Sequence, residues 1–243
     1  MTVAVLKRSK DRKVANAVTP SGQPTIANTF GLPSGKDYSC PNATSFCGKV
    51  CYAGKLEKVY KGVRETLLHN YETLRSLTMT GMVDALDAMI VDFIAECEKR
   101  GASKLFRIHW DGDFFSPTYV RAWSRVIARH QDVQFWCYTR VPSAAIRLKA
   151  DNHRNLSLYF SADPDNRQEA VKLRALTGVR LAWLGDTFAE GQQMSMETVG
   201  APGGKCPENL GRIPLISPDG SACVRCGLCI YGKADIVFSR TKK

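Results

Sequence analysis

The chain has 243 residues, of which 44% are hydrophobic and 23% are charged, and its formal net charge at pH 7 is +11. This composition is typical of a globular protein and excludes an intrinsically disordered one. No apolar run approaches the roughly 18 residues of a membrane-spanning helix, and the amino-terminal sequence lacks the long apolar region of a secretory signal. We therefore expect a cytoplasmic protein with reduced thiols and no membrane partner. Its positive charge favours a polyanionic partner such as nucleic acid.

The predicted elements begin after a basic amino-terminal segment. Residues 1–24 are expected to form a basic tail that is solvated or disordered, or that contacts nucleic acid. Residues 25–243 are expected to form a single α/β metal-binding domain, with a cysteine-rich segment over about 200–243. Near its start, residues 25–32 predict a strand, and apolar side chains at helical spacing predict helices over 56–77 and 82–100.

The sequence then alternates between strands and helices. Strands are predicted at 104–110, 133–139, 156–162 and 179–185, with helices at 116–130, 142–150 and 164–176 between them. Ser116 is expected to cap the first of these helices, with Pro117 at its first position. After residue 185 the pattern dissolves into glycine-rich sequence. This alternation predicts a parallel sheet that forms a partial or complete βα barrel, with cysteine-rich loops at both ends of the chain.

Seven of the nine cysteines fall into two groups, one near each end of the chain. The carboxyl-terminal group follows a C-x2-C-x2-C arrangement, with Cys206 available as a remote fourth ligand to Cys223, Cys226 and Cys229. Thiolates grouped in this way ligate iron-sulfur clusters or zinc. Four ligands close such a site, so we expect a structural or auxiliary centre here.

The amino-terminal group, Cys40, Cys47 and Cys51, has no evident fourth ligand nearby. Three thiolates leave one position of a metal or cluster open, and an open position is where chemistry takes place. The alternative is a purely structural centre that these three cysteines share with one carboxyl-terminal cysteine. Cys97 and Cys137 fall within a predicted helix and a predicted strand, where packing explains them.

Ligands of parallel α/β folds bind at the carboxyl ends of the strands. His109, Asp111 and Asp113 follow the second predicted strand, and we expect them to be catalytic by orienting substrate or moving protons. Strand alternation places Arg107 and His109 on one face of the sheet. The alternative is that Asp113 caps the next helix and His109 is a satisfied core histidine. The substrate-binding candidates, placed by the same argument, are Arg107, Tyr138, Arg140, Ser161 and Asp163.

Four blocks of sequence, in order, resemble the phage-associated gene product 88 family: CPNATSFCGKVCYAGKLEKVY, FRIHWDGDFFSPTYVRAW, FWCYTR and SACVRCGLCIYGKADIVF. That resemblance implies a phage or mobile-element origin, and hence the host cytoplasm. The cysteine loop after a first strand is also similar to radical S-adenosylmethionine (SAM) enzymes, whose partial barrels hold a cluster with three cysteines. The spacing here is C-x6-C-x3-C, whereas those enzymes use C-x3-C-x2-C. This second similarity implies SAM as a candidate cofactor and a reductant protein as a candidate partner.

These features together predict an iron-sulfur enzyme, with one or two clusters of the 4Fe-4S type, that modifies nucleic acid or a nucleotide-derived substrate. Two alternatives stay open. One is a zinc-containing enzyme that exchanges bases in DNA, as transglycosylases do, or hydrolyses its substrate, with an aspartate as nucleophile or general base. The other is a nucleic-acid-binding protein without enzymatic activity, stapled by metal and attracted to its partner by charge.

Overall fold

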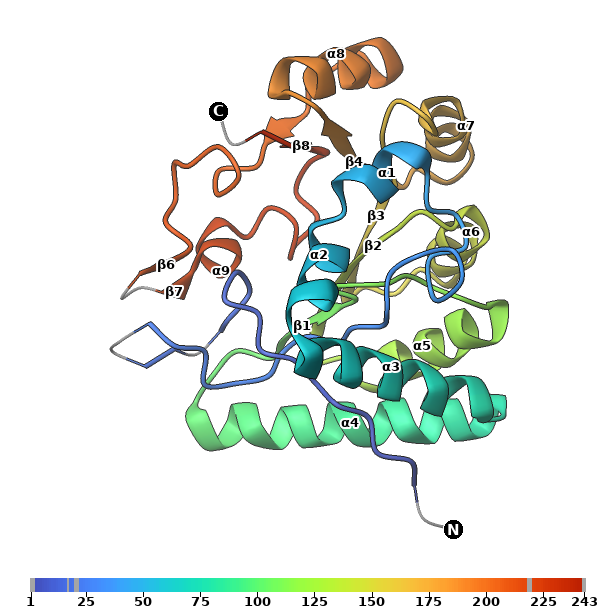
Figure 1. Ribbon diagram of the computed structural model, residues 1–243, viewed down its shortest axis with the longest axis vertical. Helices are drawn as coiled ribbons and strands as arrows, with labels where there is room; N and C mark the ends of the chain where they lie inside the picture. Colours follow the sequence, from blue (N-terminus) through green and yellow to red (C-terminus); the bar gives the residue numbers. More distant parts are fainter. Residues whose placement is uncertain (1–2, 17, 20–21, 218–219, 242–243) are drawn as a thin grey trace.

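A computed structural model describes residues 3–16, 18–19, 22–217 and 220–241 of the chain (Figure 1). The elements are, in chain order, α1 (Ser45–Val50), α2 (Tyr52–Val59), α3 (Lys61–Ser76), α4 (Met79–Arg100), β1 (Leu105–Ile108), α5 (Pro117–Arg129), β2 (Gln134–Thr139), α6 (Pro142–Asp151), β3 (Leu156–Ala162), α7 (Arg167–Thr177), β4 (Arg180–Gly185), α8 (Phe188–Val199), β5 (Gly204–Lys205), β6 (Ile216–Ser217), β7 (Gly220–Ser221), α9 (Ala222–Cys226) and β8 (Ile236–Ser239). None of these helices is long and apolar enough to cross a membrane.

Six strands form one parallel sheet in the order β1-β2-β3-β4-β8-β5. Helices α5, α6 and α7 connect the first four strands, as parallel neighbours require a crossover. The mixed α/β class and the parallel sheet are therefore confirmed. Strands β1 and β5 are the two edges of this sheet, so the described residues do not form the complete barrel that was one of the two predicted forms.

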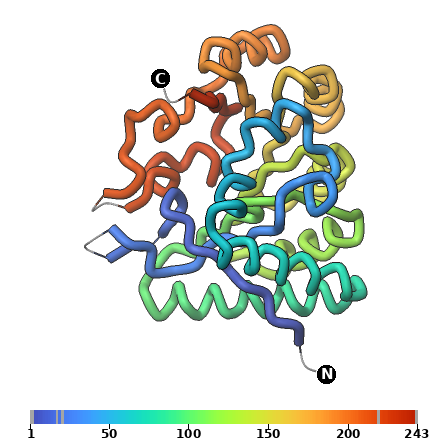
Figure 2. The backbone as a smooth tube through the Cα atoms, in the orientation of Figure 1, coloured from blue at the N-terminus to red at the C-terminus, as the bar shows by residue number. Residues whose placement is uncertain are grey.

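One face of the sheet carries the main hydrophobic core. Because successive side chains of a strand point to opposite faces, Phe106, Phe135, Phe160 and Trp183 share one side, where they pack against buried residues of α4 to α8. Figure 2 shows these helices wrapped around the lower, right and upper sides of the strands. Both faces of a parallel sheet must be covered, which leaves the opposite face to the two ends of the chain.

The opposite face is covered by the amino- and carboxyl-terminal segments. Leu105 and Trp136 pack there against Val14 and Ile230, which come from the two ends. Figure 2 shows a blue and a red stretch of the tube side by side on the left of the strands, where the N–H of Cys223 donates to the carbonyl of Lys13. Within the segment predicted as a basic tail, Arg8 forms ion pairs with two α4 carboxylates, so part of it packs on the domain.

The first predicted strand is present as an extended segment that pairs with β1 through one isolated bridge. Its residue Phe30 donates its N–H to the carbonyl of Arg107 at 3.2 Å and accepts from the N–H of Trp110 at 2.8 Å. Thr29 and Arg107 form an isolated parallel bridge. Residues 28–32 therefore run beside β1 at the edge of the sheet. Cys47 lies in helix α1, and Cys223 and Cys226 lie in α9, so the predicted cysteine-rich loops are not confirmed.

Other boundaries differ from the prediction. The helix expected over 56–77 is divided into α2 and α3, because Tyr60 adopts an extended backbone between them. Helix α8 and strand β8 lie in the region that was expected to be irregular. The predicted start of α5 is confirmed, since Ser116 Oγ accepts from the N–H of Tyr119 at 3.2 Å and Pro117 is the first helical residue.

Candidate functional site

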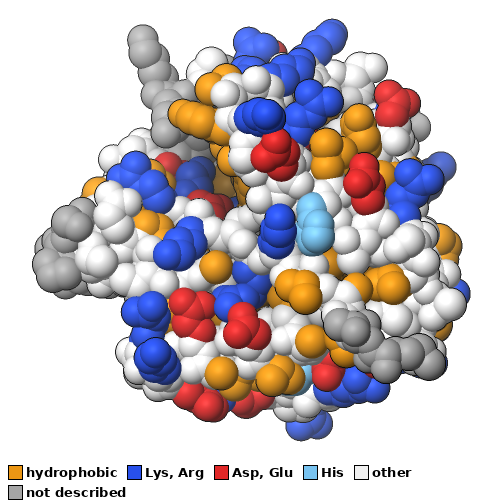
Figure 3. Space-filling model, turned by 60° about the horizontal axis from the view of Figure 1, so that its bottom comes forward, with side chains coloured by type: hydrophobic (Ala, Val, Ile, Leu, Met, Phe, Trp, Pro, Cys, Tyr) orange, Lys and Arg blue, Asp and Glu red, His pale blue; other side chains and the backbone are white. Residues whose placement is uncertain are grey.

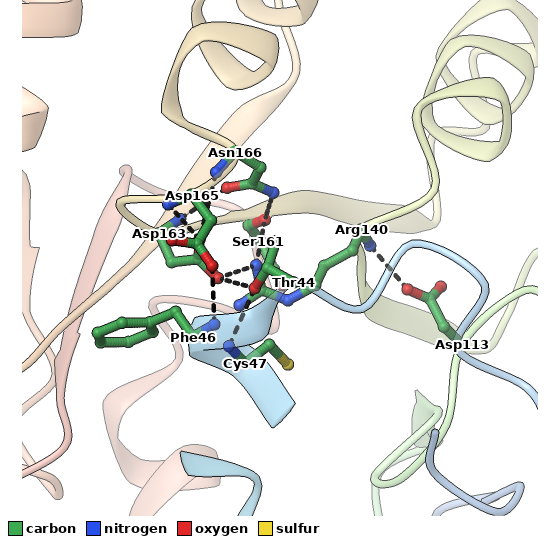
Figure 4. Close-up of polar contacts among 9 residues, drawn as sticks. All are labelled: Thr44, Phe46, Cys47, Asp113, Arg140, Ser161, Asp163, Asp165 and Asn166. Carbon is green, nitrogen blue, oxygen red and sulfur yellow. Dashed lines mark hydrogen bonds and ion pairs between the residues drawn. The ribbon is translucent and has the colours of Figure 1, made fainter. Parts of the chain in front are cut away.

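The amino-terminal cysteine segment lies over the carboxyl ends of β1, β2 and β3. Thr44 caps α1, with its Oγ1 accepting from the N–H of Cys47 at 2.9 Å and donating to Asp163 Oδ2 at 2.6 Å (Figure 4). The N–H of Phe46 donates to Asp165 Oδ2 at 2.8 Å. The first turn of α1 is thus fixed to the loop after β3, and Cys47 with it.

Arg140 connects this turn to the end of β2. Its Nη1 lies 2.5 Å from Asp163 Oδ2 and donates also to the carbonyl oxygen of Ser161 at 3.3 Å. The guanidinium lies beside the Cys47 thiol and opposes the burial that raises the pKa of that thiol. Ser161, a predicted substrate-binding residue, contributes its backbone carbonyl to this arrangement.

Asp113 joins the end of β1 to the end of β2. Its carboxylate accepts from Thr139 Oγ1 at 2.6 Å and from the N–H groups of Arg140 and Phe114, each at 2.7 Å. Burial raises the pKa of Asp113, while these hydrogen bonds oppose the shift. Both carboxylate oxygens are therefore engaged by the protein, and the geometry favours a positioning role for Asp113.

Asp111 is also buried, but its surroundings differ. Its Oδ1 accepts from the N–H of Gly112 at 2.8 Å, whereas its Oδ2 has no hydrogen-bond partner among the described residues. The carboxyl group of Glu57, from α2, lies within hydrogen-bonding reach. Burial and then this second carboxyl group hold the pKa of Asp111 well above its usual range. The pair can therefore hold a proton that a lone exposed carboxylate would release.

The three amino-terminal thiols converge on these two aspartates. Burial raises the pKa of the Cys40 thiol, and the neighbouring carboxylates of Asp113 and Asp111 raise it further. Burial likewise raises the pKa of Cys51, which lies beside Asp111 and Cys47. As predicted, the cysteines open onto the edge of the sheet that carries the aspartates.

The carboxyl-terminal cysteines gather on the face of the sheet that the chain ends cover. Cys223 and Cys229 pack beside Tyr138 of β2, and Cys206 lies against the neighbouring strands. Burial raises the pKa of Cys229 to about 12, and the thiols of Cys206 and Cys226 lie close enough to contribute to this shift. The structure thus brings the four predicted thiols together.

Two predicted substrate-binding residues belong to this second group and not to the first. The Arg107 guanidinium lies 5.5 Å from the ring centre of Tyr138 and 3.4 Å from Asp11 Oδ2. Burial raises the pKa of the Cys223 thiol, and the nearby Arg107 guanidinium opposes that shift. Arg107 and Tyr138 therefore line the covered face, although the Arg107 guanidinium lies close enough to Asp111 to oppose the rise of its pKa.

The donor chemistry of both groups fits zinc or an iron-sulfur cluster, because all members are free thiols and soft ligands. Across the described ranges, no group of three or more His, Cys, Asp or Glu side chains is arranged so that it could hold a metal ion. The sulfur atoms are thus neighbours but do not form a ready ligand cage. Cys97 and Cys137 are fully buried in the main core, as predicted.

His109 does not lie where strand alternation placed it. Strand β1 ends at Ile108, and His109 has a positive φ of 60°, which turns its side chain to the opposite face from Arg107. There its Nε2 lies 2.8 Å from the hydroxyl of Tyr119, and its ring packs edge-on against Phe114. The prediction of a shared face was wrong, and the alternative of a core histidine fits the geometry better.

Two residues of the site escaped the sequence analysis. Glu57 lies six positions after Cys51, and only the fold brings it to Asp111, so no local pattern marks it. Thr44 could have been found from its position, since a threonine directly before the first turn of a helix is a common N-cap.

Comparisons with known proteins decide the family. A family model described as "Gene product 88" matches residues 4–232. The chain belongs to the gene product 88 family. It is 54% identical to the "Gene 88 protein" of Mycobacterium phage L5 over 245 residues, which covers 99% of this chain and all of the relative. It is 56% identical to the "Gene 88 protein" of Mycobacterium phage D29 over 246 residues, with the same coverage. No solved structure matches the chain.

Membership of the gene product 88 family confirms the first resemblance stated above and supports the predicted phage origin. The comparisons do not show the second similarity, to radical SAM enzymes. The relatives carry the same gene-based name, which states no activity. The chemistry of this family member must therefore be argued from its own residues.

Proposed function

We propose that this gene product 88 protein is an iron-sulfur enzyme that modifies nucleic acid or a nucleotide-derived substrate. The observation that carries the proposal is the convergence of Cys40, Cys47 and Cys51 on one edge of the sheet, beside the carboxyl groups of Asp111 and Asp113. The Asp111 carboxyl group is buried, and its Oδ2 has no hydrogen-bond partner among the described residues, so a ligand bound at this edge would supply one.

Three thiolates would hold a cluster and leave one iron open, and such a cluster supplies electron transfer and ligand activation when bound. Residues around Cys47 favour the ionised thiol that such a cluster needs. Arg140 lies beside Cys47, and its positive charge favours the thiolate that a metal requires. Asp163, in turn, holds the guanidinium in place.

The finer architecture that we propose is a partial βα barrel. Helices cover one face of the sheet, and the other face carries polar groups such as Arg107 and Tyr138, as the interior of an open barrel would. The extended segment 28–32 would be its first strand. A cysteine loop directly after that strand makes SAM a candidate cofactor, with a reductant protein as electron donor.

The carboxyl-terminal thiols would hold an auxiliary centre. Cys223 lies in α9, and its N–H donates to the carbonyl of Lys13 at 3.0 Å, which ties the two chain ends together on the sheet. A centre at this place would staple both ends to the domain. Its four thiolate ligands leave no open position, so we assign it no part in the reaction beyond support or electron supply.

Asp111 is the residue that we expect to move a proton. The pair that it forms with Glu57 holds a proton near neutral pH, which it can give to a substrate and take back from it. The same pair also favours a second candidate function, a zinc-dependent hydrolytic or base-exchange enzyme in which Asp111 is the base or nucleophile.

Metal analysis separates the two candidates. The protein is purified without oxygen, and its visible spectrum and its iron, sulfide and zinc content are measured on one sample. We expect a brown protein whose iron content falls when Cys40, Cys47 and Cys51 are replaced by alanine together. The matched control is Cys97→Ala, which should leave the iron content unchanged. A colourless protein that carries only zinc would overturn the iron-sulfur proposal and favour the zinc enzyme.

A further inference from the structure

Exposed basic and aromatic side chains lie next to the cysteine loop, on the helices that follow it. We call this surface the basic ridge, and its exposed members are Lys49, Tyr52, Lys55, Lys58, Tyr60, Lys61 and Arg64. The candidate site described above uses none of their charges. Residues 49–64 contain one carboxylate, Glu57, to set against these cations.

The geometry of α2 turns that carboxylate away from the ridge. Successive helical residues are rotated by about 100°, so Tyr52, Lys55 and Lys58 share one side and Glu57 lies on another. Glu57 accepts from the N–H of Ser34 at 2.9 Å and approaches Asp111, both beneath the helix. The positive charge of the ridge is therefore not neutralised from within α2.

Outside α2 the neutralisation is weak. Lys61 lies 3.7 Å from Glu65, and both side chains are largely exposed. Water and salt screen such a surface pair, so the charge of Lys61 remains largely able to attract a phosphate. Lys49, Lys55 and Lys58 have no carboxylate within 4.0 Å among the described residues.

Two tyrosine rings stand among these cations. Tyr52 is 53% exposed and Tyr60 is 56% exposed, which is unusual for large apolar rings on two neighbouring turns. The hydroxyl of Tyr52 donates to the carbonyl of Trp110 at 3.1 Å, just after β1. That hydrogen bond holds one ring between the ridge and the edge of the sheet that carries Asp111.

The neighbouring surface is of mixed charge. Helix α4, below α3 in Figure 1, exposes Asp84, Asp92 and Glu98 together with Lys99 and Arg100. Figure 3, which brings the lower side of the molecule forward, shows Lys and Arg side chains grouped at the top of the view, and Asp and Glu side chains interspersed with further Lys and Arg over its lower part. Exposed cations also lie elsewhere on the molecule, so the two exposed tyrosine rings among its lysines are what distinguish the ridge.

We propose that the basic ridge binds single-stranded nucleic acid, with phosphates on the lysines and unpaired bases stacked on Tyr52 and Tyr60. Alternating cations and exposed rings recognise this ligand, since every unpaired base offers a face for stacking. The bases of a duplex do not offer that face. The inference deepens the proposed function and rests on it for the reaction, because the ridge would lead a strand toward Asp111 and the cysteine loop.

Binding is measured by fluorescence anisotropy of a labelled single-stranded oligonucleotide, DNA and RNA in turn, across a series of salt concentrations. The wild-type affinity should fall as salt rises. The double variant Lys55→Ala/Lys58→Ala should reduce the slope of log K against log salt by about 0.7 for each lost phosphate contact. Tyr60→Leu should weaken binding about tenfold without changing that slope. The matched control, Arg125→Ala/Lys172→Ala, removes two exposed cations of α5 and α7 and should change neither quantity.

Three results would overturn the inference: no binding of either strand, equal effects of the ridge and control variants, or tighter binding of duplex DNA or of anionic phosphatidylglycerol vesicles. Iron and sulfide are measured on the same samples. A protein that holds its cluster but binds no strand would refute the ridge inference alone and leave a small nucleotide-derived substrate. A protein that is purified without oxygen, binds the strand and contains no iron would refute the cluster and leave the ridge inference standing.

Discussion

Asp111 and Asp113 stand on either side of Gly112, yet one carboxylate keeps an oxygen without a donor while the other accepts three hydrogen bonds. The glycine makes this divergence possible. Its φ of 81° is a left-handed conformation, and a side chain there would overlap the backbone oxygen of Leu32. The two aspartates therefore have separable roles that substitution can test.

Replacing each aspartate by asparagine should give opposite outcomes. Asp113→Asn presents an amide to the donors of Thr139 and Arg140, so we expect it to lower the free energy of unfolding by about 2–4 kcal/mol. Asp111→Asn removes a carboxyl group that can hold and release a proton but has no protein donor on Oδ2, so it should lower stability by less than about 1 kcal/mol and abolish activity. Urea denaturation measures the first effect and an activity assay of the folded protein the second. Equal stability of the two variants would contradict this division of roles.

The ion pair of Arg140 and Asp163 should be important for the fold of the site. Asp163 is fully buried, and Arg140 is nearly so. Asp163→Ala would leave a buried guanidinium without its partner, and we expect a loss of about 3–5 kcal/mol in the free energy of unfolding. The matched control is Glu65→Gln, which breaks the exposed pair with Lys61 and should cost about 0.5 kcal/mol or less. A comparable loss in both variants would show that burial does not decide the effect.

His109 should make stability fall in acid. Burial lowers the pKa of His109 to about 3 in the folded protein, whereas an unfolded chain has a value near 6.5. Below about pH 6.5 the unfolded state binds the proton and the folded state does not, so stability is lost at about 1.4 kcal/mol per pH unit. Above that pH the contribution of His109 is constant.

His109→Gln should remove this dependence. The difference in unfolding free energy between wild type and variant, measured in urea, should shrink by about 2 kcal/mol between neutral pH and about pH 5. Tyr119→Phe removes the hydrogen bond to His109 but keeps the imidazole, so it should retain the wild-type slope. A pH-independent difference between wild type and His109→Gln would contradict the burial of a neutral imidazole.

Much of the site's position could be predicted from the sequence, because strands of a parallel sheet end at one edge. That rule placed Asp111, Arg140 and Asp163 together with the cysteine loop before any contact was known. It failed at His109, where a positive φ breaks the alternation of the strand. It also could not assign Arg107 and Tyr138 to the covered face with the second cysteine group, since that grouping depends on how the carboxyl-terminal segment folds back.

Glu57 shows a different limit. Its role comes from the way α2 packs over the end of β1, and the break at Tyr60 that separates α2 from α3 is set by tertiary structure and not by periodicity. The same packing exposes the basic ridge. Local sequence patterns therefore located the strand ends, while the partners of Asp111 and the orientation of the lysines required the fold.

The central claim is that Cys40, Cys47 and Cys51 hold a cluster with one open iron. The most direct test is the electron paramagnetic resonance spectrum of the dithionite-reduced protein in which Cys206, Cys223, Cys226 and Cys229 are replaced, so that one cysteine group remains. We expect a reduced-cluster signal that changes when SAM or another small ligand is added. A spectrum without any cluster signal, from a folded variant prepared and reconstituted without oxygen, would contradict the claim.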